Sequence, residues 1–353
     1  MFRSCRRLVV RCSLPLLLLL APAWATALDH VRLATNWRAE APHGGFYQAL
    51  VDGTYERFGL KVDIIQGGGQ VNYKPLLLAG RIDFLLTANL LTVFDNYKNR
   101  APTVVVAAIF QKDPLAFMAH PGQGYENFDN LKTAPIAFVS KDTQFLAWKW
   151  LENVHGFRDK AIRNYNYNLA PFIANKKSIQ QCYSVAEPIA VHEQAGFIPV
   201  VHLLADHGFS TYSTLLETRL ALVQERPDIV ARFVEASILG WAHYLYGDRT
   251  QANALLMREN PELSLSEIEE SVALMKSHGI VNSGDALVSG IGSMNPQRVA
   301  DFYDQMVAVG LYRKSDVDLM KVIRYDFVNK GVGLEITAGQ SADDKRVLRT
   351  HKD

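Results

Sequence analysis

Cysteines and long apolar runs are scarce in this sequence of 353 residues. Two of its three cysteines, Cys5 and Cys12, lie in the N-terminal segment, which leaves only Cys182 in the rest of the chain. A single cysteine excludes a disulfide framework, and no Cys/His cluster has the spacing of a zinc site. Beyond the N-terminal segment, no apolar run approaches the roughly eighteen residues that a membrane-spanning helix needs.

An excess of charge of one sign is missing as well, because 37 Lys and Arg residues almost balance 36 Asp and Glu residues. No run rich in Lys or Arg occurs beyond the first dozen residues, which argues against nucleic acid as a partner. The motifs of P-loops, dinucleotide-binding folds, serine hydrolases and zinc peptidases are also absent. With 48% hydrophobic residues, the composition is that of a globular protein and excludes collagen-like and disordered classes.

The N-terminus has the three parts of a secretory signal peptide. A basic segment from Arg3 to Arg11 precedes an apolar run of mostly leucine, and Ala25-Thr26-Ala27 forms a small-residue cleavage site. We therefore predict that residues 1–27 are removed and that the mature chain begins near Leu28. No cysteine follows the cleavage site, so no lipid anchor is expected. The prediction is a periplasmic protein of a Gram-negative cell, with secretion from another cell type as the alternative.

Strands and helices alternate along the predicted mature chain. We predict strands over residues 31–37, 62–66, 83–87 and 104–110 in a first unit, and over residues 135–140, 162–168, 180–185 and 199–204 in a second. The longest helices between them are expected over residues 44–57 and 145–155. A strand over residues 215–224 and four amphipathic helices, over residues 228–246, 250–258, 266–278 and 295–309, follow. This alternation indicates the α/β class, with largely parallel sheets.

The order of elements predicts two lobes. Residues 28–111 together with residues 212–336 form lobe 1, and residues 112–211 form lobe 2, with crossovers near residues 111–114 and 209–214. The polar tail, residues 337–353, lacks periodicity and is expected to be disordered.

Candidate ligand-binding residues of the first unit follow its strands, since ligands of open α/β sheets bind at the carboxyl ends of the strands. Asn36 and Trp37 end the first strand. His43 and Gly44 open the next helix, whose free N–H groups suit a carbonyl or an anion; the alternative is an ordinary glycine-rich turn. Gly68 lies in a run of three glycines that either cradles a ligand or only turns the chain.

Four further candidates follow later strands. Thr87 ends the third strand and is either a helix cap or a ligand contact. Tyr165 and Asn168 belong to a segment of alternating asparagine and tyrosine that suits a planar ring, the alternative being an exposed edge strand. Glu187, between two apolar segments, needs a partner, and either caps the next helix or accepts a hydrogen bond from a ligand.

Taken in order, the motifs resemble those of a known family. They are Asn36-Trp37 with His43, the turn from Gly53 to Leu60, Leu78-Ala79-Gly80 with Asp83-Phe84, Asn168-Leu169-Ala170, Ala186-Glu187-Pro188 and Glu225-Arg226-Pro227. Over nearly all of the predicted mature chain they resemble substrate-binding proteins of ABC importers. Within that group the chain is similar to the alkanesulfonate binders and to the thiamine-pyrimidine family.

The resemblance implies a two-lobed type II periplasmic binding protein fold with a ligand cleft between the lobes. It implies a monomer that binds a small molecule, needs no cofactor and no metal, and partners a membrane ABC permease with its ATPase. The first-choice ligand is a thiamine-precursor pyrimidine. Asn36 and Asn168 would bind the ring edge, and Glu187 would accept from an exocyclic amine.

The remaining candidates complete this expected site. Trp37 and Tyr165 would stack on the ring, while His43 and Gly44 would meet a polar substituent; Tyr165 has this role on composition alone. A sulfonate, a flavin-like ring or another aromatic compound are alternative ligands.

Eukaryotic relatives of this family include a thiamine pyrimidine synthase, which consumes pyridoxal phosphate and its own histidine and uses iron. Where that enzyme has a lysine and a histidine, this sequence has Thr87 and Leu91, and its crossover near residues 207–212 has no cysteine. We therefore expect binding without catalysis. The enzyme alternative would need another lysine, Lys112 or Lys141, at the centre of the pocket.

Overall fold

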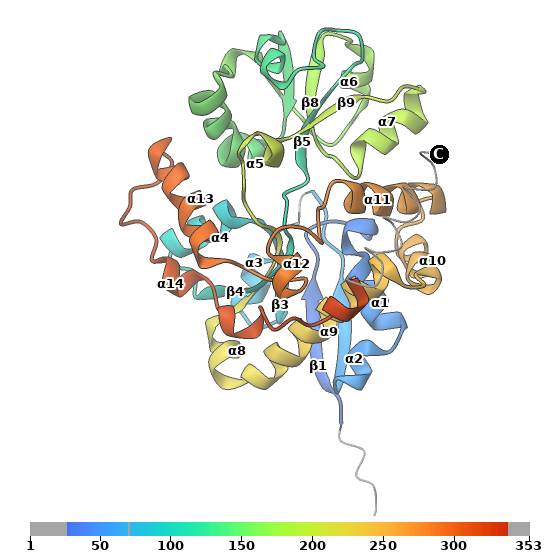
Figure 1. Ribbon diagram of the computed structural model, residues 1–353, viewed down its shortest axis with the longest axis vertical. Helices are drawn as coiled ribbons and strands as arrows, with labels where there is room; N and C mark the ends of the chain where they lie inside the picture. The colour runs from blue at the N-terminus through green and yellow to red at the C-terminus, as the bar shows by residue number, and fades with distance from the viewer. Residues whose placement is uncertain (1–26, 70, 338–353) are drawn as a thin grey trace, which may run out of the picture.

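The computed structural model describes residues 27–69 and 71–337, and these residues form two lobes, each built on a five-stranded sheet (Figure 1). The predicted signal peptide, except Ala27, and the predicted polar tail, except Thr337, lie outside the described residues.

The sheet of lobe 1 has the strand order β2-β1-β3-β10-β4. Its strands are β1 (Asp29–Ala34), β2 (Leu60–Ile65), β3 (Phe84–Asn89), β4 (Thr103–Phe110) and β10 (Ser213–Arg219). Strand β1 runs parallel to β2 and β3, whereas β10 lies between β3 and β4 and runs antiparallel to both. The chain thus returns from lobe 2 into the interior of this sheet, not to its edge.

The sheet of lobe 2 repeats this plan, with the order β7-β6-β8-β5-β9. Its strands are β5 (Leu115–Ala119), β6 (Ile136–Val139), β7 (Ile162–Asn164), β8 (Ser178–Tyr183) and β9 (Val200–Leu203). Strand β5 runs antiparallel to both β8 and β9. In each sheet the antiparallel strand is therefore the one that has just crossed from the other lobe.

Helices cover both faces of the sheets. Lobe 1 carries η1 (Ala41–His43), α1 (Gly44–Val51), α2 (Thr54–Arg57), α3 (Lys74–Leu78), α4 (Leu90–Lys98), α8 (Leu220–Glu225), α9 (Pro227–Tyr246), α10 (Thr250–Glu259), α11 (Leu265–Ser277), α12 (Ala286–Ser289), α13 (Pro296–Ala308), α14 (Leu319–Val322) and η7 (Tyr325–Phe327). Lobe 2 carries η2 (Phe128–Thr133), α5 (Lys141–Thr143), η3 (Gln144–Trp148), η4 (Leu151–His155), η5 (Asp159–Ala161), α6 (Ala170–Ala174), α7 (Glu187–Ala195) and η6 (Leu204–His207).

Several elements differ from the sequence prediction. The helix predicted over residues 44–57 is divided at Gly53, whose φ of 73° is left-handed. The strand predicted over residues 215–224 ends at Arg219, the last residue with a strand partner, and continues as α8. Strand β5 was not predicted at all, and the helix predicted over residues 145–155 is wound as two π-helical segments.

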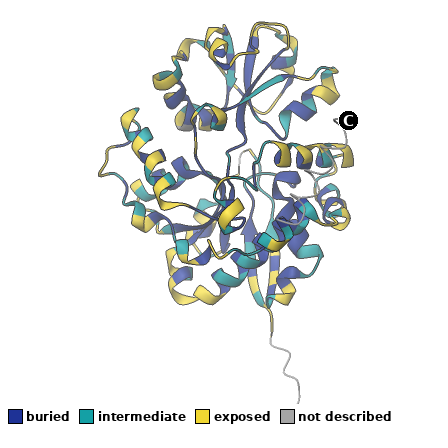
Figure 2. Cartoon of the chain, in the orientation of Figure 1, coloured by how far each residue is buried: buried dark blue, intermediate teal, exposed yellow. Residues whose placement is uncertain are grey.

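Helix α9 packs closely on β3 and on α1 in the core of lobe 1. Phe233 of α9 stacks on Phe84 of β3, with 4.1 Å between the ring centroids. A Cβ atom on Gly240 would lie 2.3 Å from the carbonyl oxygen of Gly45, so α1 and α9 meet in direct backbone contact. The central strands of both sheets are buried, while the outer helix faces are exposed (Figure 2). In the described part of the chain, no helix is both long and apolar enough to cross a bilayer.

Candidate ligand-binding site

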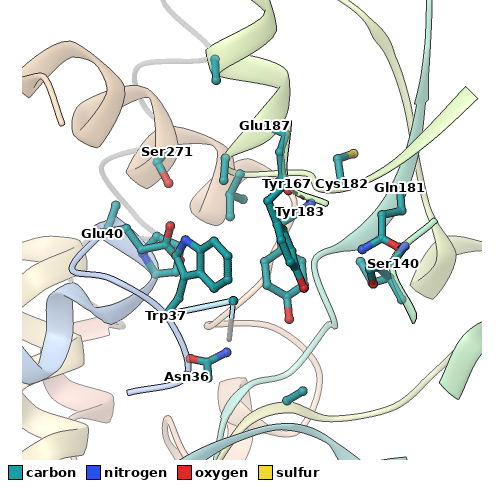
Figure 3. A pocket seen from close by; sticks show the side chains of 18 of the residues that line it. Asn36, Trp37, Glu40, Ser140, Tyr167, Gln181, Cys182, Tyr183, Glu187 and Ser271 are labelled. Atoms are coloured by element: carbon teal, nitrogen blue, oxygen red, sulfur yellow. Dashed lines mark hydrogen bonds between the residues drawn. The ribbon is translucent and has the colours of Figure 1, made fainter. Parts of the chain in front are cut away.

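A cavity of about 480 Å³ lies between the lobes, where the carboxyl ends of β1, β2, β3 and β6 meet the N-terminus of α7 (Figure 3). Lobe 1 contributes the loops after β1 and β2, the end of β3 and residues from α11. Lobe 2 contributes the loops after β6 and β7, strand β8 and the first turns of α7. This position is the one expected for ligands of open α/β sheets.

Asn36 and Trp37, which follow β1, both line the cavity. The Nε2 atom of His43 lies 3.0 Å from Oδ1 of Asn36, so the imidazole donates to the amide oxygen. Figure 3 shows the amide nitrogen of Asn36 turned toward the cavity. Burial lowers the pKa of His43 to about 4, which keeps the ring neutral. His43 is therefore a positioning residue behind Asn36 and does not itself line the cavity.

Aromatic rings from both lobes meet at one side of the cavity. The centroids of Trp37 in lobe 1 and Tyr167 in lobe 2 lie 4.8 Å apart, and Tyr165 is 5.3 Å from Tyr167. A Cβ atom on Gly69 would lie 3.0 Å from both the Trp37 and the Tyr167 ring, so glycine leaves room for this contact. The sequence prediction included Tyr167 in the segment suited to a planar ring but did not choose it as a candidate; its spacing of two residues from Tyr165 was the available signal.

The backbone of Tyr167 is strained, with a φ of 65°. Left-handed geometry is uncommon for a bulky residue, and here it directs the ring toward Trp37 across the cleft. The strain coincides with the contact between the lobes.

Glu187 is the first residue of α7 and lines the cavity. Its Oε2 accepts a hydrogen bond of 2.8 Å from the backbone N–H of Tyr183, and its Oε1 accepts one of 3.4 Å from the hydroxyl of Tyr165. Burial raises the pKa of this carboxyl group. The N-cap position is held by Ala186, without a side-chain cap, so Glu187 is not the N-cap residue that one alternative proposed.

Glu40 faces the same cavity from lobe 1 and was not predicted from the sequence. Burial raises its pKa to about 8, and the negative charge of Glu187 contributes to the same shift. Two carboxyl groups from opposite lobes therefore lie close enough to repel each other when both are ionised.

The charge of the cavity is of one sign. The acidic residues that line it are Glu40, Asp113, Asp142, Glu187 and Glu267. Among the described residues that line it there is no Lys, Arg or His. No group of three or more His, Cys, Asp or Glu within the described ranges is placed to hold a metal ion.

Helix α11 closes the cavity from a part of the chain that sequence reasoning did not connect with the site. Leu263, Glu267, Ile268 and Ser271 line the cavity. The helix packs against η1 in lobe 1 and against α7 in lobe 2, and Figure 1 shows it at the boundary of the lobes. A capping box between Ser264 and Glu267 fixes its first turn.

Of the remaining predicted residues, one lines the cavity and three do not. Gly68 lines the cavity, whereas Gly44, Thr87 and Asn168 do not. A Cβ atom on Gly44 would lie 2.0 Å from the ring of Tyr244, so this glycine serves the packing of α1 on α9. Thr87 donates its hydroxyl to a buried carboxylate, and Asn168 is exposed and accepts from the N–H of Ala170 at 3.0 Å.

Solved structures share this two-lobed arrangement. The alkanesulfonate-binding protein SsuA from Xanthomonas axonopodis pv. citri superposes with a TM-score of 0.60 at 14% identity, over 85% of this chain and 99% of that chain. The periplasmic nitrate-binding protein NrtA from Synechocystis PCC 6803 gives a TM-score of 0.59 at 12% identity, over 85% and 87%. The fold is therefore that of periplasmic binding proteins, which confirms the predicted fold class.

The chain belongs to the NMT1/THI5-like family, whose model matches residues 40–248. The family resemblance predicted from the sequence motifs is thus confirmed. A riboflavin-binding protein, RibY from Chloroflexus aurantiacus, is 22% identical over 324 residues, which cover 88% of this chain and 89% of the relative. Helix α11 lies outside the residues matched by the family model.

Proposed function

We propose that this protein is a periplasmic solute-binding protein of an ABC importer and that it captures a planar heteroaromatic amine, with a thiamine-precursor pyrimidine as first choice. The observation that carries the ligand class is the cavity itself, which combines aromatic rings with carboxyl groups and has no cation among the described residues that line it. The family and the fold support the transport role.

The ring of the ligand lies against the aromatic side chains of Trp37, Tyr165 and Tyr167, which supply flat apolar surface from both lobes. The amide of Asn36, held by His43, donates to a ring nitrogen. Glu187 accepts from an exocyclic amine, because its two oxygens are already fixed by Tyr165 and Tyr183 and keep further lone pairs.

An anionic ligand is disfavoured by the same residues. A sulfonate gains most from Arg, Lys or several N–H donors, whereas the described residues that line this cavity include five acidic ones and no Lys, Arg or His. The pyrimidine synthase alternative is disfavoured because it needs a lysine. Lys112 forms an ion pair of 2.8 Å with Asp206, and neither Lys112 nor Lys141 lines the cavity.

Riboflavin is a second candidate, because RibY matches this chain over most of both lengths. The cavity volume of about 480 Å³ also falls in the range of about 300–1,000 Å³ that holds drug-sized ligands. A flavin would use the same aromatic wall.

A thermal-shift screen followed by calorimetric titration tests the ligand class. The panel contains 4-amino-5-hydroxymethyl-2-methylpyrimidine, thiamine, riboflavin, taurine and a longer alkanesulfonate. A true ligand at a hundred times its Kd adds about 2.7 kcal/mol of stability. Binding of a sulfonate, without a response to the pyrimidines or riboflavin, would show the proposed ligand class to be wrong.

Export and assembly are tested separately. We expect the periplasmic fraction to contain a monomeric chain that begins near Leu28, and mass spectrometry with light scattering measures both. An intact N-terminus in the membrane fraction would contradict the predicted cleavage.

A further inference from the structure

The acidic residues of the cavity differ in how their charge is satisfied. Asp113 accepts hydrogen bonds of 3.0 Å from the Asn89 side chain and from the backbone N–H of Leu115. Glu267 accepts one of 2.7 Å from the N–H of Ser264, and Asp142 is exposed to solvent. These three groups need nothing from a ligand.

Glu40 is the exception. Among residues 27–69 and 71–337, no hydrogen-bond donor reaches its carboxylate, and the charged group that acts on it most strongly is Glu187 of the opposite lobe. Glu40 is half-buried, and a carboxylate that loses part of its solvation without gaining a donor is costly; a second carboxylate nearby adds repulsion. A positively charged donor placed between Glu40 and Glu187 would remove both costs.

Ser271 offers a second unsatisfied group on the same side of the cavity. It is 4% exposed, lines the cavity, and its Oγ has no hydrogen-bond partner in the described part of the chain. Its helix, α11, packs against η1, which directly follows Glu40. Figure 3 shows both Glu40 and Ser271 in the wall of the cavity beside Trp37.

We propose that Glu40 and Ser271 form a subsite for a cationic substituent of the ligand, and that Glu40 determines the preference for a ligand with a protonated amine over its neutral counterpart. This inference rests on the proposed function, since it places the ligand ring on Trp37 and Tyr167 and the substituent beyond it. The ammonium group then lies between carboxylates of both lobes and favours the closed cleft.

Two probes that differ at one group test the subsite. The first is 4-amino-5-aminomethyl-2-methylpyrimidine, whose side-chain amine is protonated at neutral pH, and the second is the corresponding 5-hydroxymethyl compound, which has no charge there. Calorimetric titration of the full mature protein measures both Kd values at low salt. We expect the amine to bind roughly tenfold or more tightly.

Glu40→Gln keeps the size of the side chain and removes the charge, so it should erase most of that preference. Ser271→Ala should weaken the amine a few-fold and leave the alcohol almost unchanged. Glu262→Gln is the matched control, because its side chain is 79% exposed and pairs with Arg38 outside the cavity. The control should retain the full preference.

The outcomes separate the two proposals. Equal Kd values for the two probes, or an unchanged preference in Glu40→Gln, would overturn the cation subsite while the pyrimidine assignment stands. If neither pyrimidine binds but riboflavin or a sulfonate does, the proposed pyrimidine ligand is wrong and the subsite loses its basis. Melting curves of each variant without ligand confirm that the variant is folded.

Discussion

Glu217 and Glu40, both in lobe 1, have opposite surroundings. Glu217 on β10 is 1% exposed, and its carboxylate accepts from the ammonium of Lys74, from the hydroxyl of Thr87 and from the amide of Asn96. Glu40 has no hydrogen-bond donor among the described residues and faces another carboxylate across the cleft. Glu217 therefore stabilises lobe 1, whereas the carboxylate of Glu40 is left to accept from a ligand.

The number of protein donors distinguishes a structural carboxylate from one that is available to a ligand. A carboxylate that has three donors from neighbouring elements, as Glu217 has, fixes β10 to α3, β3 and α4. A carboxylate that lines a cavity without donors is a cost to the free protein, and evolution retains such costs at binding sites.

Glu217→Ala should have the largest effect. It leaves the ammonium of Lys74, whose side chain is 19% exposed, without its partner, and breaking a buried ion pair costs about 3–5 kcal/mol, which is the upper bound here. Urea denaturation of the mature protein measures the loss. Glu40→Gln serves as the comparison and should not destabilise the free protein. A loss below about 1 kcal/mol for Glu217→Ala would mean that the network is not structural.

Glu187→Ala should have the second-largest effect, which is on the affinity for the ligand. Removing a charge-assisted acceptor costs about 1.5–3 kcal/mol, so the Kd for an aminopyrimidine should rise by about tenfold to a hundredfold. Titration calorimetry measures this, beside melting curves without ligand. A lower melting temperature with an unchanged Kd would remove Glu187 from the site.

The raised pKa of Glu40 should make the stability of the ligand-free protein depend on pH. Its pKa is raised to about 8 in the folded state, against 4.5 for the ordinary group, so between these values the folded protein binds a proton that the unfolded chain does not. Stability from this group is present at low pH and falls as the pH rises through 8, by at most about 1.4 kcal/mol per pH unit.

The measurement is the free energy of unfolding between pH 6 and pH 8.5. Glu187, whose pKa is also raised, acts in the same direction, so stability should fall less steeply with pH in Glu40→Gln than in the wild type, but it should still fall. An identical slope in both proteins would contradict the assignment of Glu40 as an unpaired carboxyl group.

Tyr167→Ala should have the smallest effect. Aromatic pairs contribute about 0.5–1.5 kcal/mol beyond buried area, so loss of the ring contact with Trp37 should weaken ligand binding by about two- to tenfold. Phe145→Ala, at a residue of lobe 2 that is 76% exposed, is the control and should leave the Kd unchanged. Equal effects of the two variants would show that the aromatic wall is not part of the site.

Much of the fold could be predicted from the sequence, because hydrophobic strands and amphipathic helices alternate and strong breakers separate them. Strand β5 could not, since its five buried residues follow Asp113-Pro114 with no period that distinguishes a strand from a loop. The end of β10 also escaped prediction. The prediction extended the strand through Leu220 to Gln224, but leucine, alanine and glutamine favour a helix there, and no neighbouring strand extends beside them to supply hydrogen bonds.

The lining of the candidate cavity could be predicted where it depends on strand ends alone. Asn36, Trp37 and Glu187 line the cavity for that reason. Whether the other candidates line the cavity depends on the direction of their side chains, which composition does not reveal. Thr87 donates to a carboxylate within lobe 1, and Asn168 accepts from the N–H of Ala170 in the helix that follows it. The contribution of α11 depends on a contact between segments more than two hundred residues apart, which no local pattern reveals.

The position of β10 has a consequence for how the chain folds. Lobe 2 is contiguous in sequence, so its sheet can assemble from residues already made and near one another. The sheet of lobe 1 stays open between β3 and β4 until β10, more than a hundred residues later, inserts there with Leu216 opposite Leu86 and Ala107. Closing such a long loop is slow, and until it closes β3 and β4 present unpaired edges. Lobe 2 should therefore fold first, and the incomplete sheet of lobe 1 is the stage most exposed to aggregation.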